Sequence, residues 1–184
     1  MGKLELCPMT ESLSRAFWEG FQPDPAVYED PNAQAPYTFS PEDADARYHR
    51  RLAKGKHLLA ILLDGTVIGD IEFKRFEPQA NRCTFGIHMK NDSFKNRGYG
   101  TEAERLALQY AFETLKVETV LADALRTNTR SRHVLEKVGF RLIRQDERLA
   151  YYACCRAWCS GTSHAAESGS RRRAIPEIHG DTET

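Results

Sequence analysis

One stretch near the middle of the chain constrains the fold more than any other. His57–Leu63 is an almost uninterrupted apolar run, Asp64-Gly65 follows it, and residues 67–76 then alternate between apolar and polar side chains. An Asp-Gly pair between two such runs is typical of a β-hairpin. Because the first run is apolar on both faces, it predicts a central strand that is covered on both sides. The second strand would carry Glu72 on a polar face.

Strand and helix signals alternate along the rest of the chain. Helix starts are indicated by capping side chains at Thr10, Ser40 and Asn128, and Gly139 would end the last of these helices. A one-sided apolar stripe predicts a further helix. The stripe comprises Ala103, Leu106, Ala107, Tyr110, Ala111 and Leu115. Helices are expected over residues 10–21, 40–54, 100–115 and 128–139, and further strands over residues 3–7, 82–89, 118–125, 141–144 and 148–154. This order indicates a mixed α and β fold.

Length and composition are those of one globular domain. The chain has 184 residues, 41% of them hydrophobic, and 26 basic side chains balance 26 acidic ones. This balance argues against a nucleic-acid partner. The longest apolar run is far shorter than the ~20 residues that cross a bilayer, and no signal peptide is expected, so a cytoplasmic protein without a membrane partner is predicted. We expect a domain over residues 1–156 and a disordered tail over residues 157–184, since the tail offers few large apolar side chains.

The cysteines favour neither a disulfide framework nor a metal site. There are five of them, an odd number, and two are adjacent. Such a set suits a reducing compartment. Zinc sites usually show paired ligands at short, regular spacing, which is missing here. We therefore expect no metal. The cysteines are Cys7, Cys83, Cys154, Cys155 and Cys159.

A glycine-rich segment lies between an expected strand and an expected helix. It reads Lys95-Asn96-Arg97-Gly98-Tyr99-Gly100-Thr101-Glu102-Ala103. Glycines let a backbone approach a ligand closely, and the start of a helix offers free N–H groups to a phosphate. A dinucleotide-binding loop would need a third glycine, and a Walker loop would end in Gly-Lys-Ser/Thr. A turn that merely starts a helix is a further alternative.

A second segment, about 30 residues farther on, narrows these alternatives. It reads Asn128-Thr129-Arg130-Ser131-Arg132-His133-Val134-Leu135-Glu136-Lys137-Val138-Gly139-Phe140. Together the two segments resemble the GNAT superfamily of acyl-CoA-dependent N-acyltransferases, and most of all the branch with ribosomal-protein N-terminal and spermidine acetyltransferases. The first is similar to the family's diphosphate loop, Gln/Arg-x-x-Gly-x-Gly/Ala. Lys95 stands where the family usually has Gln or Arg, which keeps the charge but not the planar fork of arginine.

The resemblance covers roughly residues 3–155 and implies both a fold and a co-substrate. The implied fold is GNAT-like and of the α/β (α+β) class: a central, mixed, mostly antiparallel and twisted sheet of 6–7 strands, flanked by about four helices. The implied co-substrate is acetyl-CoA. The residues expected to bind it are Ile87, His88, Met89, Lys95, Asn96, Arg97, Gly98, Tyr99, Gly100, Thr101, Asn128 and Ser131.

The implied reaction is direct attack of an amine on the thioester in a ternary complex. An ammonium group with a pKa of ~10 must first lose a proton. His88 and Glu72 are the candidate bases, and His88 is favoured because an imidazole titrates near neutral pH. Several family members have a tyrosine at the position of Leu135 as the acid for the departing thiolate, and Ser131 is the expected substitute. The missing tyrosine keeps a second interpretation open: an inactive, regulatory acyl-CoA-binding module.

The expected acceptor is an amine. Residues 19–45 carry seven acidic side chains and no Lys or Arg, and the resemblance places this region over the acceptor pocket. Carboxylates and aromatic rings suit a cation. We therefore expect a small cationic amine such as a polyamine or an amino sugar, or a protein N-terminus, bound by a monomer or homodimer. The aromatic candidates for acceptor binding are Trp18, Phe21, Tyr28 and Tyr37.

Overall fold

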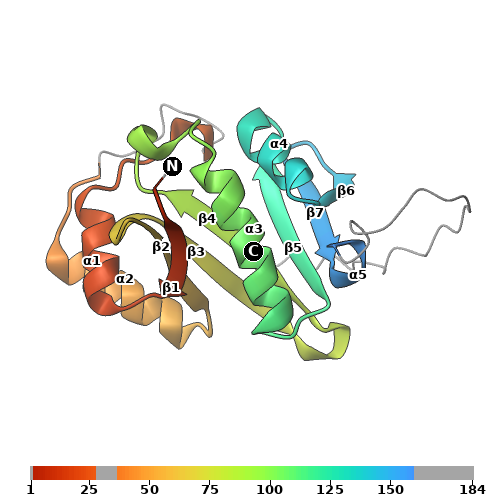
Figure 1. The fold of residues 1–184 in the computed structure, drawn as a ribbon, viewed down its shortest axis with the longest axis horizontal. Helices are drawn as coiled ribbons and strands as arrows, with labels where there is room; N and C mark the ends of the chain where they lie inside the picture. Colours follow the sequence, from red (N-terminus) through yellow and green to blue (C-terminus); the bar gives the residue numbers. More distant parts are fainter. Residues whose placement is uncertain (1, 28–36, 160–184) are drawn as a thin grey trace, which may run out of the picture.

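The computed structural model of the protein describes residues 2–27 and 37–159. They form a seven-stranded sheet in the order β1-β2-β3-β4-β5-β7-β6 (Figure 1). Neighbouring strands are antiparallel except for β4 and β5, which are parallel. The strands are β1 (Leu4–Pro8), β2 (His57–Leu63), β3 (Thr66–Glu77), β4 (Arg82–Met89), β5 (Thr119–Leu125), β6 (Arg141–Gln145) and β7 (Leu149–Cys155). The expected mixed, mostly antiparallel sheet is confirmed.

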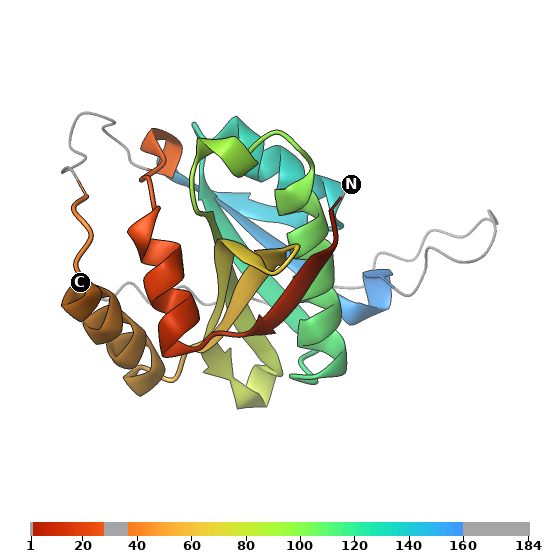
Figure 2. The same ribbon diagram turned by 60° about the vertical axis from the view of Figure 1, so that its left-hand side comes forward.

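Helices cover both faces of this sheet. Figure 2 shows α1 and α2 on one side of the strands and α3 on the other. The helices are α1 (Glu11–Glu19), α2 (Pro41–Ala53), α3 (Tyr99–Glu113), α4 (Thr129–Lys137) and α5 (Arg156–Cys159), with short 3-10 turns η1 (Pro25–Val27), η3 (Pro78–Ala80) and η4 (Asp92–Phe94). The predicted caps are confirmed: Thr10, Ser40 and Asn128 each accept a backbone N–H three residues on. Gly139 is left-handed, with φ 109°.

Strand β2 divides its side chains between two apolar cores, as its two-sided apolar pattern predicts. Leu59 and Ile61 pack into the large core on the α3 side of the sheet. Leu58 and Ala60 pack into the smaller core beneath α1 and α2. All four side chains are buried, so β2 is the covered interior strand that the sequence predicts.

The predicted apolar stripe of α3 is confirmed at its three alanines, which are buried, while Tyr110 and Leu115 pack against the edge of the large core. The buried residues of this helix are Ala103, Glu104, Ala107, Leu108, Ala111 and Phe112. Leu106, Tyr110 and Leu115 are only half-buried. The helix thus presents its Leu108 and Phe112 side to the sheet, and this rotation carries the acidic side chain of Glu104 inside.

The polar side of β3 does not face solvent. Asp70 and Glu72 are 1% and 5% exposed, because the C-terminal half of α2 lies over them and Arg51 reaches both carboxylates. The alternating pattern therefore predicts the strand and its polar face correctly, but it does not reveal that α2 covers this face.

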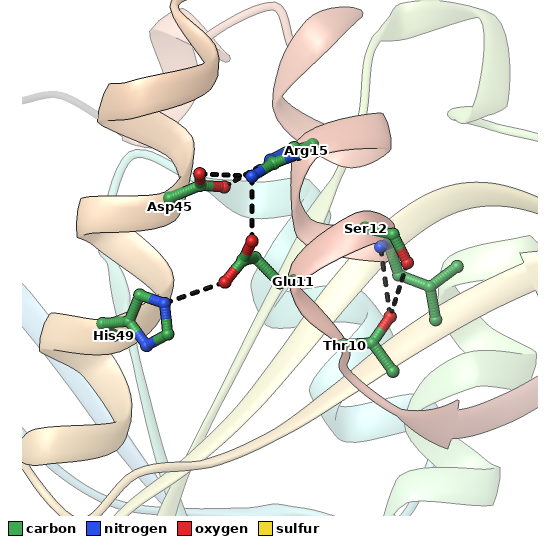
Figure 3. Close-up of polar contacts among 7 residues, drawn as sticks. Thr10, Glu11, Ser12, Arg15, Asp45 and His49 are labelled. Atoms are coloured by element: carbon green, nitrogen blue, oxygen red, sulfur yellow. Dashed lines mark hydrogen bonds and ion pairs between the residues drawn. The ribbon is translucent and has the colours of Figure 1, made fainter.

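An ionic network fixes α1 against α2 (Figure 3). Arg15 on α1 donates to both carboxylate oxygens of Asp45 on α2 at 2.5 Å and to Glu11 at 2.8 Å. The other oxygen of Glu11 lies 2.9 Å from Nε2 of His49. Asp45 is one of the seven acids expected near the acceptor, and here it serves the contact between the two helices instead.

The end of the described chain departs from the expected tail. Ala157–Cys159 complete α5, and the Trp158 ring lies 4.2 Å from the guanidinium carbon of Arg141. The rest of the predicted tail, residues 160–184, lies outside the described residues. Cys7, Cys83 and Cys155 are free.

Among the described helices, none has the length and apolar character needed to cross a membrane.

Candidate active site

The central feature of the site is a V-shaped parting of two neighbouring strands. Strands β4 and β5 pair over only three positions, from Arg82 opposite Thr119 to Thr84 opposite Leu121. Beyond these positions β4 continues to Met89 and β5 to Leu125 without pairing with each other. Unpaired strand backbone offers hydrogen-bonding groups to a ligand, since buried N–H and C=O groups need partners.

A cavity of about 870 Å³ occupies this region. Its wall includes Ile87, His88 and Met89 of β4, the loop before α3, the start of α4, and parts of α1 and α2. The sequence thus identified residues that the fold brings together from five separate elements. The expected residues that line it are Trp18, Phe21, Tyr37, Glu72, Ile87, His88, Met89, Lys95, Asn96, Gly98, Gly100, Thr101, Asn128 and Ser131.

The loop before α3 leaves the first turn of the helix open. Gly98 is the N-cap in a left-handed conformation, φ 83°, and no side chain caps the N–H groups behind it. A Cβ atom added at Gly100 would meet no atom within 4 Å. These N–H groups and the positive end of the helix dipole suit an anion, so the site fits the diphosphate of a CoA thioester.

Two basic side chains gather at this end of the cavity around one acid. Nζ of Lys95 lies 2.9 Å from Asp24, and Arg130 at the start of α4 also pairs with Asp24. Burial opposes ionisation of Asp24, but Lys95, the N–H of Ala26 and Arg130 hold its pKa below the ordinary value. The acid thereby holds both cations beside the loop.

Helix α4 closes the cavity on the far side of β5. The Asn128 side chain accepts the N–H of Ser131 at 3.0 Å, so its confirmed role is that of a cap. Ser131 is half-buried, and its hydroxyl forms no hydrogen bond with any described residue. Leu135 lies one turn on and is buried in the large core, which leaves Ser131 as the polar side chain at this position.

His88 is held by a buried carboxylate. Its Nδ1 lies 3.2 Å from Oδ1 of Asp70, whose other oxygen lies 2.5 Å from Nη2 of Arg51. Burial works against the charge on Asp70, yet His88 and Arg51 lower its pKa. A carboxylate can only accept a hydrogen bond, so this contact favours the His88 tautomer with its proton on Nδ1.

Glu72 is surrounded by cations, which does not suit a base. It contacts Lys56 at 2.8 Å, Lys74 at 2.6 Å and Arg51 at 3.2 Å. Burial alone would raise its pKa, but hydrogen bonds from the two lysines and the charge of Arg51 lower the pKa to about 2. Between His88 and Glu72, the surroundings favour His88.

A second carboxyl group, Glu104, lines the cavity in the opposite state. Its side chain is 3% exposed, and Oε2 has no hydrogen-bond partner among the described residues. Burial raises its pKa to about 8. Glu104 is therefore protonated at neutral pH and adds no negative charge to a cavity rich in cations.

Two of the expected site residues that the structure describes do not line the cavity. Arg97 is exposed on the loop, and Tyr99 packs against the large core. Tyr28 lies outside the described residues. The segment lines the cavity through Lys95, Asn96, Gly98, Gly100 and Thr101.

Comparison with known proteins agrees with this architecture. A domain model described as "Acetyltransferase (GNAT) domain" matches residues 3–141. The chain belongs to the GNAT acetyltransferase family. An uncharacterised N-acetyltransferase of Bacillus subtilis (strain 168), YnaD, is 26% identical over 111 residues, which are 56% of this chain. The match spans 61% of YnaD, less than two thirds of that relative.

Solved structures share the fold of this GNAT domain. AAC(6')-Ib, in complex with paromomycin and acetyl-CoA, has a TM-score of 0.72 at 18% identity and covers 89% of this chain and 99% of its own. A spermidine N-acetyltransferase SpeG chimera from Vibrio cholerae and hSSAT has a TM-score of 0.70 at 15% identity and covers 86% and 98%. At these identities the likeness concerns the fold alone.

The GNAT resemblance did not identify four kinds of residue that the structure adds. They are Asp70 behind His88, Arg51 behind Asp70, the buried Glu104, and a basic face of α2. The basic face had a signal in the sequence, because Arg47, Arg50, Arg51 and Lys54 follow the spacing of one helical stripe. Glu104 had none, since a single acid beside an apolar stripe usually faces solvent.

Proposed function

We propose that this protein is an acetyl-CoA-dependent N-acetyltransferase that acetylates a primary amine by direct attack in a ternary complex. The observation that supports it most is the parting of β4 from β5 directly beside the open first turn of α3. One cavity joins this opening to His88 and to the α1 and α2 side of the sheet. A thioester carrier and an amine could therefore meet inside it.

Acetyl-CoA would supply an activated acetyl group and a thiolate leaving group. Its diphosphate would be held by the N–H groups behind Gly98 and Gly100, with Lys95 and Arg130 adding positive charge. Backbone N–H groups near Ile87–Met89 would bind the thioester oxygen, an arrangement that stabilises charge in the transition state. The unpaired end of β4 supports this assignment.

The proton transfers fall to two side chains. Nε2 of His88 accepts a proton from the acceptor's ammonium group, and Asp70 stabilises the imidazolium that results. Oγ of Ser131 holds a proton on the α4 wall, where a departing thiolate needs one. The free hydroxyl of Ser131 and the Asp70–His88 contact support these roles.

The carrier site is tested at Gly100. A Gly100→Glu side chain would enter the open space at the first turn of α3 and bring a negative charge to the phosphates, so we expect CoA binding to be lost in calorimetry. Gly100→Ala is the matched control, because its Cβ meets no atom, and it should bind and turn over. Unchanged affinity in Gly100→Glu would contradict the proposed site.

A second function, an inactive regulatory acyl-CoA-binding module, is favoured by one observation: a buried leucine, Leu135, stands where several family members have a tyrosine. The two functions differ in turnover. Release of free thiol from acetyl-CoA with a panel of primary amines supports the enzyme. Tight acetyl-CoA binding without release of thiol under any condition supports the module.

The proposal so far allows several chemical classes of acceptor. Polyamines, amino sugars and protein N-termini are all primary amines, and the names of two structural neighbours refer to spermidine and paromomycin. The free thiols of Cys7, Cys83 and Cys155 support a reducing, cytoplasmic setting, and we propose a monomer or homodimer. The charge of the acceptor is better argued from the cavity itself.

A further inference from the structure

The end of the cavity under α2 is basic. Arg47, Arg50, Arg51 and Lys54 line it from one face of the helix, and Lys56 follows directly. The carboxylates on this wall are Asp70 and Glu72. Glu72 already contacts Arg51 and Lys56, and Asp70 contacts Arg51 and His88. Each of these acids therefore already has basic partners within ion-pair distance, although neither oxygen of Asp70 has a hydrogen-bond partner among the described residues.

Three of the cations have no acidic partner among the described residues. Arg47, Arg50 and Lys54 form no ion pair with any residue in the described ranges. The acids of α2 itself do not line the cavity: Glu42 and Asp43 lie exposed in its first turn, and Asp45 pairs with Arg15. Asp24 lines the opposite end and pairs with Lys95 and Arg130. Glu29 and Asp30 lie outside the described residues, and of the other acids expected near the acceptor only Asp24 lines the cavity.

Two buried hydrogen-bond donors lie beside these cations. Trp18 Nε1 and the Tyr37 hydroxyl are buried without a partner in the described part of the chain, and both residues line the cavity. Their rings lie 5.6 Å apart, and the guanidinium carbon of Arg47 lies 4.9 Å from the Trp18 ring. An indole N–H can only donate, and a buried donor without an acceptor is costly.

We propose that the acceptor is a small amine that also carries a carboxylate or phosphate group, and that this group binds among Trp18, Tyr37, Arg47, Arg50 and Lys54. The proposal rests on the proposed acetyltransferase function. It answers an imbalance of charge, because the described residues at this end of the cavity bring five Arg and Lys side chains against two carboxylates, together with two buried donors that lack an acceptor. Guanidinium groups match the oxygens of both anions. A second cationic group on the acceptor would instead be repelled.

A matched series of amines tests the charge preference. γ-Aminobutyrate, butylamine and putrescine share a four-carbon chain but end in a carboxylate, a methyl group and a second ammonium. O-Phosphoethanolamine and ethanolamine form the phosphate arm. Binding to the protein with saturating CoA is measured by NMR titration, and turnover by thiol release. We expect at least one anionic amine to bind about tenfold or more tightly than its uncharged partner, and the two arms distinguish carboxylate from phosphate.

Variants locate the anion. Arg50→Gln and Lys54→Gln should each remove most of this preference, whereas Lys137→Gln, an exposed cation outside the cavity, should leave it intact. Equal or undetectable binding across the series, or tighter binding of putrescine, would overturn the proposal. Preferential binding of an anionic amine without turnover of any amine would support the anion site and contradict the proposed enzymatic function instead.

Discussion

Glu104 is a carboxyl group that the fold has removed from both water and cations. Its pKa rises from 4.5 to about 8 through burial. Between these pH values the folded protein holds a proton that the unfolded chain releases, so the free energy of unfolding falls as pH rises. Glu104→Gln mimics the neutral form. We expect it to be about 3 kcal/mol more stable than the parent protein at pH 7, with little difference at pH 4.5.

Urea unfolding at pH 4.5, 6, 7 and 8 measures this effect. Glu113→Gln on the exposed side of the same helix is the control, and its stability difference should not grow with pH. A Glu104→Gln difference that is constant across the series would show that the carboxyl group is ionised in the folded protein.

Substitutions of His88 and of Asp70 should impair catalysis in different ways. His88→Gln removes the proposed base, and we expect kcat to fall about 100-fold or more while the KM for acetyl-CoA stays the same. Asp70→Asn keeps the base but removes the carboxylate that orients Nδ1 and stabilises the imidazolium, so kcat should fall less and its pH profile should shift. An unchanged pH profile in Asp70→Asn would assign Asp70 to structure alone.

The sequence indicated His88 as a candidate base but did not indicate that Asp70 contacts it. Its alternating strand and its place before the glycine loop were visible in the residue order. The Asp70 contact depends on which residues β3 and β4 place opposite each other, and Asp70 is indeed the register partner of His88. Register and the covering of a polar face by a distant helix are tertiary facts that local patterns do not contain.

At the scale of elements, Glu72 ties α2 to the sheet. It contacts Arg51 of α2, Lys56 in the following loop, and Lys74 of its own strand. Glu72→Gln would leave these cations without a counter-charge, so we expect the free energy of unfolding at pH 7 to fall by about 3 kcal/mol. The folded pKa is about 2 against an ordinary 4.5, so this stabilisation is present above pH 4.5 and is lost as pH falls towards 2.

Chemical unfolding of Glu72→Gln and the parent protein at pH 7, 5, 4 and 3 would show the two stabilities converging as the acid side is approached. The exposed Glu113→Gln variant again serves as the control. A stability gap that widens below pH 4.5 would contradict the assigned ion pairs.

The positions of the helices and strands could largely be predicted from the sequence. Caps at Thr10, Ser40 and Asn128 are local events, set by one side chain and a few N–H groups, and the structure confirms all three. The rotation of α3 about its axis could not be predicted in this way. Leu106 and Leu108 are equally apolar, and only packing against β1 and the sheet decides which of them is buried. Because this rotation was not predicted, the burial of Glu104 was not predicted either.

At the scale of the whole molecule, two sets of strands are linked by only a short stretch of backbone pairing. The strands β1 to β4 and the strands β5 to β7 are connected through three residue pairs between β4 and β5. The motif resemblance predicted where a carrier would bind. The number of paired positions between β4 and β5, however, is set by strands far apart in the sequence. A ligand that fills the opening would contact both halves and oppose their separation.

We therefore expect acetyl-CoA to stabilise the molecule as a whole. At 100 times its Kd, a ligand that binds only the folded state adds about 2.7 kcal/mol, which raises Tm by about 5–10 °C in a domain of this size. Differential scanning calorimetry measures the shift, and amide exchange should slow in β4, β5 and the first turn of α3. Gly100→Ala should keep the shift and Gly100→Glu should lose it. ATP, which has phosphates but no pantetheine to fill the V between β4 and β5, should give a smaller shift, and an equal shift with ATP would mean that the opening between the strands takes no part in binding.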